Sequence, residues 1–155
     1  MQQTAIETLN DLILINNDRI KGYERALKDN RSREADLDVL FREMIAQSQG
    51  FNTALASLVQ QSGSQPETEG SLSGKLHRAW MDFKTTFTGH NRKHLLIECE
   101  RGEDASKEAY SEALHEDNGL TDAQREIIAM QAREQSDSHD RVKALRDETL
   151  SRKAD

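Results

Sequence analysis

Two side chains of metal-ligating type fall on helix faces that the apolar pattern turns inward. Glu98 and His139 supply a carboxylate and an imidazole, two ligand types that iron and manganese accept in proteins. Glu24 and Glu43 offer two further carboxylates at less inward positions. So few ligands indicate a single-metal site at most, and iron or manganese is the ion we would expect in it.

A pair of bridged metal ions needs more ligands than the inner positions supply. Helical bundles that hold two iron or manganese ions use a Glu from each of two helices and a Glu-x-x-His from each of the other two. On the second and fourth long helices, Glu43 is followed by Ala46 and Glu134 by Asp137, where histidines would be needed. We therefore expect no di-metal oxidase site, no other cofactor and no enzymatic activity.

A layer of polar residues is predicted near the middle of the four long helices. In heptad register the inner positions are apolar near the helix ends and polar near mid-span, with Glu98 level with residues near 138. We expect the layer to set helix pairing, with His139 or Gln135 as the partner of a buried Glu98. The predicted layer consists of Asn17, Gln47, Glu98, Gln135 and His139.

The other reactive groups nearby favour structural roles. Cys99 lies on an inner face beside Glu98 and Glu100, and this acidic setting suits a buried small hydrophobe better than a nucleophile. Glu100, Glu103 and Asp104 are interpreted as a solvated acidic face, with a cation-binding or partner-docking patch as the alternative.

The elements that must position these residues are long amphipathic helices. Apolar residues recur at three- and four-residue spacings, and the 155 residues include one proline, Pro66. Thr4 with Glu7, and Thr121 with Gln124, predict capping boxes at two helix starts. The predicted helices span residues 4–29, 32–61, 75–88, 91–116 and 121–151 of a single domain covering residues 1–155.

The order of these helices predicts an all-α, four-helix bundle. Short turns near residues 30 and 118 make the long helices on either side antiparallel neighbours, so the chain forms two helix hairpins. A polar connection over residues 62–74 and a short fifth helix over residues 75–88 join the hairpins. Two hairpins joined by one long crossover is the ferritin-like connectivity.

The short fifth helix carries an apolar stripe that must be covered. Apolar patches of more than a few hundred Å² are uncommon on monomers. The stripe therefore packs either on its own bundle or on a second copy, which makes a homo-oligomer the expected partner. Its residues are Leu76, Trp80, Phe83 and Phe87.

Three stretches of the sequence resemble a bacterial family of ferritin-like four-helix-bundle proteins without an assigned function. They are residues 16–24, residues 98–104 (Glu-Cys-Glu-Arg-Gly-Glu-Asp) and residues 139–141 (His-Asp-Arg). The resemblance extends over nearly the whole chain, and residues 98–104 are its most specific part. It implies the fold and a bacterial cytosolic setting, and it adds little about chemistry.

Charge and hydropathy exclude several classes of function. The 28 acidic and 21 basic residues give a net charge of −7, and no basic stripe interrupts the acidic balance. Nucleic acids and anionic membrane surfaces are therefore not expected as partners. The chain has no apolar run of the roughly 18 residues that indicate a membrane span. Without a visible secretory signal, we expect a cytoplasmic protein.

These observations predict a small cytosolic bacterial helical-bundle protein that acts by association and not by catalysis. The ferritin-like resemblance loosely implies a stress-related role, although a fold alone does not establish one. The alternative is a metal-binding ferritin-like protein with a degenerate or single-metal bundle site.

Overall fold

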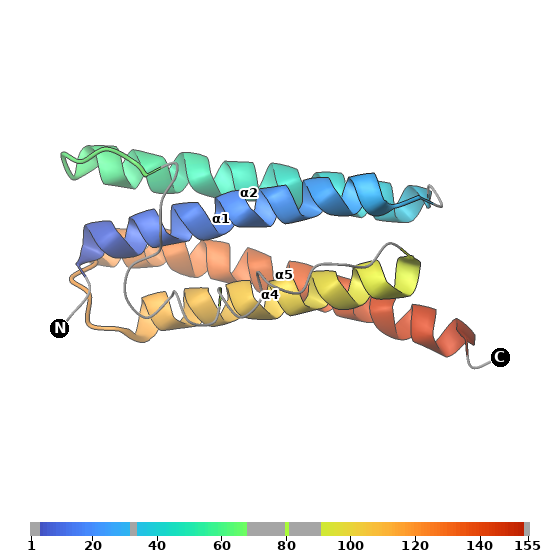
Figure 1. Cartoon of the computed structure of the whole chain (residues 1–155). Helices are drawn as coiled ribbons and strands as arrows, with labels where there is room; N and C mark the ends of the chain where they lie inside the picture. Colours follow the sequence, from blue (N-terminus) through green and yellow to red (C-terminus); the bar gives the residue numbers. More distant parts are fainter. Residues whose placement is uncertain (1–3, 32–33, 68–79, 81–90, 154–155) are drawn as a thin grey trace.

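Four long helices dominate the computed structural model, which describes residues 4–31, 34–67, 80 and 91–153 (Figure 1). No strand occurs within these ranges, so the prediction of an all-α, four-helix fold is confirmed. None of the helices in the described part combines the length and apolar character needed to cross a membrane. The helices are α1 (Ala5–Asp29), α2 (Ala35–Gln61), α4 (Arg92–His115) and α5 (Asp122–Lys153).

Side-chain caps define where three of the helices begin. Thr4 accepts a hydrogen bond from the Glu7 backbone N–H at 3.2 Å, and Asn91 accepts one from the His94 N–H at 2.9 Å. At the start of α5, Thr121 and Gln124 form a reciprocal capping box: each side chain accepts from the other residue's backbone N–H. Such caps satisfy N–H groups that have no partner within the helix.

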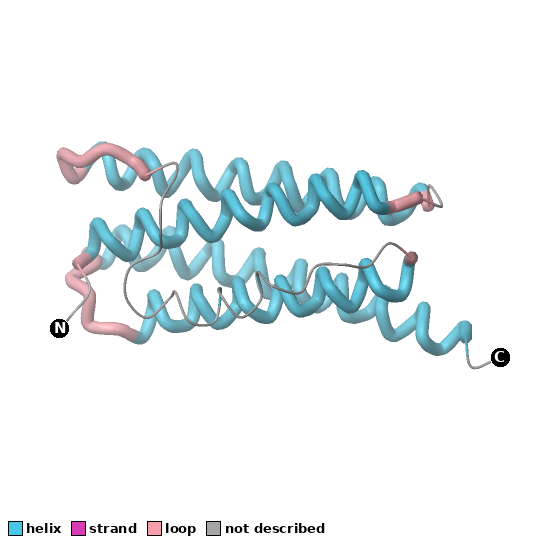
Figure 2. The backbone as a smooth tube through the Cα atoms, in the orientation of Figure 1, coloured by secondary structure: helices cyan, strands magenta, loops and turns pink. Residues whose placement is uncertain are grey.

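The helices form two antiparallel hairpins, α1 with α2 and α4 with α5, joined at each turn by a short loop (Figure 2). The hairpins face each other through α1 and α4 on one side, and through α2 and α5 on the other. Arg19 of α1 bonds Glu103 of α4, while Ser138 of α5 bonds Gln47 of α2. Each of the four helices therefore contacts two neighbours.

The second and third long helices begin at the same end of the bundle. Arg92, the first residue of α4, bonds Glu34 and Asp36 at the start of α2, and α2 ends at the far end of the molecule (Figure 1). The end of α2 and the start of α4 therefore lie at opposite ends of the bundle. The predicted fifth helix, residues 75–88, lies outside the described residues except for Trp80.

The apolar core is divided into two clusters. One cluster lies toward the start of α1 and includes Leu12, Leu55 and Ile128. The other lies toward the end of α1 and includes Phe41 and Leu95. Polar side chains occupy the interior between them, from residue 16 to residue 19 in α1 and from residue 131 to residue 139 in α5.

Arg92 connects three helix ends, and this connection predicts a pH-dependent contribution to stability. Its guanidinium donates to Asp36 at 2.8 Å, to Glu34 at 2.7 Å and to Thr149 of α5 at 2.9 Å. The hydrogen bond from Arg92 lowers the pKa of Asp36 below its ordinary value. A carboxylate with a lowered folded-state pKa stabilises the fold above the unfolded-state pKa and loses that effect as the pH falls.

We predict that Arg92→Gln lowers the free energy of unfolding near neutral pH, because it removes the ion pair with Asp36. The loss should be only about 1 kcal/mol, because the Asp36 side chain is half-exposed and solvent weakens the pair. The difference from wild type should shrink below about pH 4, where unfolded aspartate begins to be protonated. Urea denaturation at a series of pH values measures it. Arg152→Gln, at the exposed pair with Glu148, is the control. A difference that stays constant down to about pH 2.5 would contradict the assignment.

Candidate functional site

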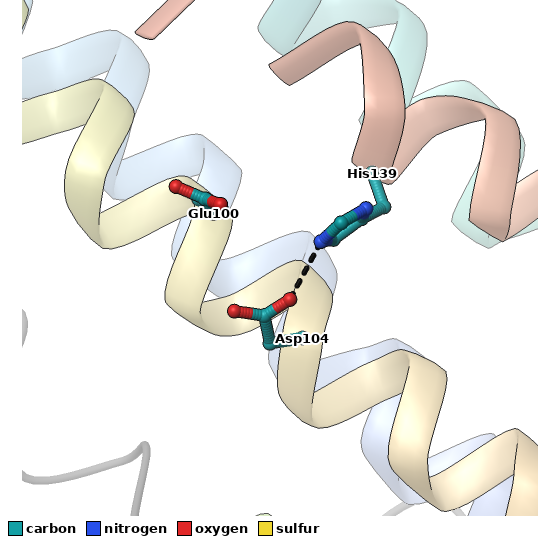
Figure 3. A group of neighbouring side chains, drawn as sticks. All are labelled: Glu100, Asp104 and His139. Atoms are coloured by element: carbon teal, nitrogen blue, oxygen red, sulfur yellow. Dashed lines mark hydrogen bonds and ion pairs between the residues drawn. The ribbon is translucent and has the colours of Figure 1, made fainter. Parts of the chain in front are cut away.

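Glu100, Asp104 and His139 meet where α4 packs against α5 (Figure 3). Glu100 and Asp104 are one turn apart on α4 and share a face, because residues at i and i+4 of a helix are neighbours. His139 reaches them from α5. One ligand atom from each of the three residues lies within 4.8 Å of the other two.

The His139 imidazole stands between two carboxylates. Its Nε2 lies 2.6 Å from Asp104 Oδ1, and its Nδ1 lies 3.1 Å from Asp140 Oδ1. A neutral imidazole carries a single N–H, so it can donate to only one of these oxygens. Both contacts become favourable when the ring is doubly protonated, or when a cation binds Nε2 while Nδ1–H donates to Asp140.

The second arrangement is the one that metal-binding histidines commonly adopt. A ligating imidazole usually donates its other N–H to a carboxylate or a carbonyl, which fixes the ring and makes it a better ligand. The same contact with His139 lowers the pKa of Asp140. Asp140 is therefore placed to orient the ring, and Asp104 and Glu100 to share a cation with it.

The three residues differ in their access to solvent. His139 is 8% exposed and Glu100 is 9% exposed, whereas Asp104 lies at the surface. Asp104 is therefore the solvent-facing member of the group. Ligand atoms around a transition metal lie roughly 3 Å apart, so Asp104 and His139 would have to separate by a few tenths of an ångström.

A cationic side chain already contacts this site. Arg146 donates to the Glu100 carboxylate and also to Asp147, at 2.7 Å, on its own helix. The hydrogen bond with Asp147, reinforced by the charge of Glu100, raises the pKa of Arg146. The carboxylates at this position therefore attract positive charge.

The predicted ligands Glu98 and His139 are not paired in the structure. Glu98 is buried, but the ring nitrogens of His139 contact Asp104 and Asp140. The contact of His139 with Asp104 places the imidazole more than one helical turn along α4 from Glu98. The predicted register, which was counted back from the turn near residue 118, was therefore wrong at this level.

The two weaker candidates lie on the surface of the bundle. Glu24 and Glu43 are both exposed, and Glu43 forms an ion pair with Arg141. One Glu-x-x-His does occur in the chain, from Glu112 to His115 at the end of α4. His115 is exposed and its Nδ1 lies 2.6 Å from the Ser111 carbonyl oxygen.

The acidic residues of α4 do not form the solvated face that we expected. Asp104 is exposed, but Glu103 is 1% exposed and Glu100 is 9% exposed. Burial is possible because each meets a cation, Arg19 for Glu103 and Arg146 for Glu100. The i, i+4 spacing of Glu100 and Asp104 shows in the sequence that these two carboxylates share a helix face. The contact of His139 with them depends on the packing of α5 and has no signal in the sequence.

The centre of the bundle holds a buried ion pair. Arg19 of α1 donates from Nε and Nη2 to Glu103 of α4, at 2.9 and 2.5 Å, and from Nη1 to Ser48 of α2 at 3.0 Å. Burial alone lowers the pKa of Arg19, but the charge of Glu103, the hydrogen bond to it and the nearby tyrosines together outweigh burial, so the pKa stands above its ordinary value. A charged arginine thus ties three helices together.

Neutral hydrogen bonds extend the polar interior from this pair toward the apolar cluster that contains Phe51. Asn16 donates to the Tyr110 hydroxyl at 3.0 Å, Tyr110 donates to Gln131 at 2.7 Å, and Gln131 donates to the Phe51 carbonyl oxygen at 3.1 Å. This chain passes through all four helices. Burial raises the pKa of Tyr110, so the phenol stays protonated as a donor.

The five residues of the predicted polar layer have different environments. Gln135 is buried and donates to the Glu103 carbonyl oxygen at 2.9 Å, while Glu98 and His139 are buried as described above. Asn17 and Gln47 are half-buried; Asn17 accepts from Asn52, and Gln47 accepts from Ser138. The predicted layer did not include Arg19, Glu103 or Tyr110.

Trp80 is the one described residue of the predicted association stripe, and its own bundle covers it. It is 1% exposed, and its indole N–H donates to Asp18 at 2.8 Å. Together with Cys99 and Tyr23 it lines a cavity of about 20 Å³, which is room for one water molecule. Leu76, Phe83 and Phe87 lie outside the described residues.

Cys99 is 4% exposed, so the prediction that it is buried is confirmed. Burial raises the pKa of its thiol, and the charges of Glu103 and Glu98 raise it further. The thiol therefore stays protonated and packs as a small apolar group.

Comparison with known proteins finds one family. Residues 4–116 match the model of the family described as "Domain of unknown function (DUF2383)". The matched range includes Glu100 and Asp104 and stops before α5, which carries His139. No curated protein matches the chain.

We predict that Arg19→Met lowers the free energy of unfolding by about 3–5 kcal/mol, because it leaves Glu103 buried without a countercharge. The double variant Arg19→Met with Glu103→Leu should recover much of the loss, since it removes both charges. Urea denaturation of the two single variants and the double variant gives the coupling energy.

Arg141→Met is the matched control, since its pair with Glu43 is about half-exposed on both sides and should change stability by less than about 1 kcal/mol. A loss of under about 1 kcal/mol for Arg19→Met would show that the buried pair is not an important stabilising contact.

Proposed function

This chain belongs to the family described as Domain of unknown function (DUF2383), and we propose that it binds one divalent transition-metal ion through Glu100, Asp104 and His139. The observation that carries the proposal is the position of His139, with one ring nitrogen on Asp104 and the other on Asp140. A metal ion on Nε2 makes every contact in this group favourable.

The ligand set indicates the class of metal. Two carboxylates and one imidazole suit manganese, iron(II), cobalt and zinc, whereas calcium and magnesium prefer oxygen ligands alone. Three protein ligands leave coordination positions for water. The expected role is binding or handling of a single ion, in keeping with the single-metal alternative derived from the sequence.

The bundle centre does not fit a bridged pair of metal ions. Such a centre needs carboxylates and imidazoles from four helices. The interior of this bundle instead holds the Arg19 guanidinium, its Glu103 partner and a set of amides and hydroxyls. The proposed site lies to one side, between α4 and α5 alone.

The positions of the helices support a ferritin-like connectivity as part of this proposal. The end of α2 and the start of α4 lie at opposite ends of the bundle, as in four-helix bundles with one long crossover. The burial of Trp80 within its own chain leaves that residue of the predicted stripe little surface for association with a second copy.

We predict that protein freed of metal with a chelator gains thermal stability when manganese, cobalt or zinc is added. At about a hundredfold excess over the dissociation constant, a ligand of the folded state stabilises it by about 2.7 kcal/mol. Asp104→Asn and His139→Gln should abolish the rise in melting temperature, and Glu100→Gln should weaken it. Calorimetric titration gives the stoichiometry, which we expect to be one ion per chain.

Two conservative changes at exposed positions serve as controls. Glu108→Gln lies one turn beyond Asp104 on α4, and Asp137→Asn lies two residues before His139 on α5. Both remove a carboxylate without touching the group and should leave metal binding unchanged. The proposal fails if no ion raises the melting temperature of wild type, or if the rise survives in Asp104→Asn and His139→Gln.

A further inference from the structure

We infer that Arg146 is a built-in competitor for the metal: its guanidinium occupies the Glu100 carboxylate until a divalent ion displaces it. This inference rests on the proposed function and concerns how the site is regulated. It assigns to one side chain the task of setting the metal concentration at which the site fills.

The geometry of two antiparallel helices brings Arg146 to the site. Glu100 precedes Asp104 by one turn on α4, and Arg146 follows His139 by two turns on the same face of α5. Because the helices run in opposite directions, His139 meets Asp104 and Arg146 meets Glu100 at the neighbouring level. The competing cation and the proposed ligands are therefore held by the same pair of helices.

Glu100 needs a cation at all times. Its side chain is only 12% exposed, and an anion withdrawn from water is costly unless it is paired. Arg146 supplies the charge while the metal is absent, through a charge-assisted hydrogen bond. A divalent ion at the site would take over the same carboxylate and repel the guanidinium.

Arg146 has a second hydrogen-bond acceptor, Asp147, which it keeps if the contact with Glu100 is broken. Its Nε and Nη2 already donate to Asp147 Oδ1, at 3.1 and 2.7 Å, and Asp147 is exposed. The Arg146 side chain is itself 26% exposed. Displacement therefore breaks the contact with Glu100 while the contacts with Asp147 and water remain, so metal binding need not bury an unpaired charge.

Removing the competitor should tighten metal binding. We predict that Arg146→Gln lowers the dissociation constant for zinc by at least about tenfold, as expected when a metal no longer has to break a hydrogen bond between charged groups. Arg146→Lys keeps the charge and loses the second donor, so it should fall between wild type and Arg146→Gln. Titration of chelator-treated protein with zinc alone measures all three.

Lys143→Gln is the matched control for net charge. Lys143 is exposed on α5, and its charge acts on Asp140 through space. The change removes the same single positive charge from the neighbourhood of the site but leaves the Arg146 contact in place. It should shift the dissociation constant by no more than about threefold, because charges at exposed positions are screened.

A measurement on the wild type keeps the inference testable if Arg146→Gln does not fold. The Arg146 side-chain Nε–H signal in a nitrogen-correlated NMR spectrum, identified by its absence in Arg146→Lys, should shift when zinc saturates the protein. In Asp104→Asn the same zinc concentration should leave that signal unchanged.

The outcomes separate the competitor from the site itself. If wild type binds zinc but Arg146→Gln and Lys143→Gln change the affinity equally, or if the Nε–H signal does not move, the competitor role is overturned and the metal site stands. If neither wild type nor Arg146→Gln binds zinc, manganese or cobalt, the proposed function fails, and this inference fails with it.

Discussion

A charge that leaves water must be matched inside the protein, and in this bundle the match between Arg19 and Glu103 decides how the two hairpins meet. Both side chains are almost completely buried, and they come from helices of different hairpins. Apolar side chains tolerate several alternative packings, but an isolated charge in the interior does not. The two hairpins are therefore restricted to the one alignment in which Arg19 reaches both Glu103 and Ser48.

The rest of the interior follows from this alignment. Two apolar clusters lie on either side of the polar band and supply the area removed from water that drives the helices together. The amides and the phenol in the band satisfy one another across all four helices, from Asn16 through Tyr110 and Gln131 to the backbone of α2. A shift of one helix by a turn would break several of these hydrogen bonds together, which makes the polar band a means of specifying register.

The proposed metal site depends on the same register. Gln135 donates to the backbone of Glu103, and His139, one turn farther along α5, contacts Asp104, the next residue along α4. The register in which the buried Gln135 amide donates to α4 therefore also brings an imidazole to a carboxylate at the surface. The α4–α5 pair thus combines a structural inner face with the outer edge at which we propose a cation site, and Arg146 contacts Glu100 at that edge.

Local features of the molecule could be predicted from the sequence, and long-range ones could not. The four long helices follow from the spacing of apolar residues, because helical periodicity involves residues within one turn of each other. Of the two predicted capping boxes, Thr121–Gln124 forms in full, whereas at Thr4–Glu7 the structure shows only the hydrogen bond from the Glu7 N–H to the Thr4 side chain. The burial of Cys99 followed in the same way. The pairing of Glu98 with His139, and the solvated state of Glu103, were predicted wrongly because each depends on which residue of a distant helix stands opposite. One helical turn advances 5.4 Å, which exceeds the reach of a hydrogen bond, so an error of one turn exchanges every partner. Only the packed tertiary structure, in which the buried charges Arg19 and Glu103 must meet across the hairpins, decides that Asp104 and not Glu98 faces His139.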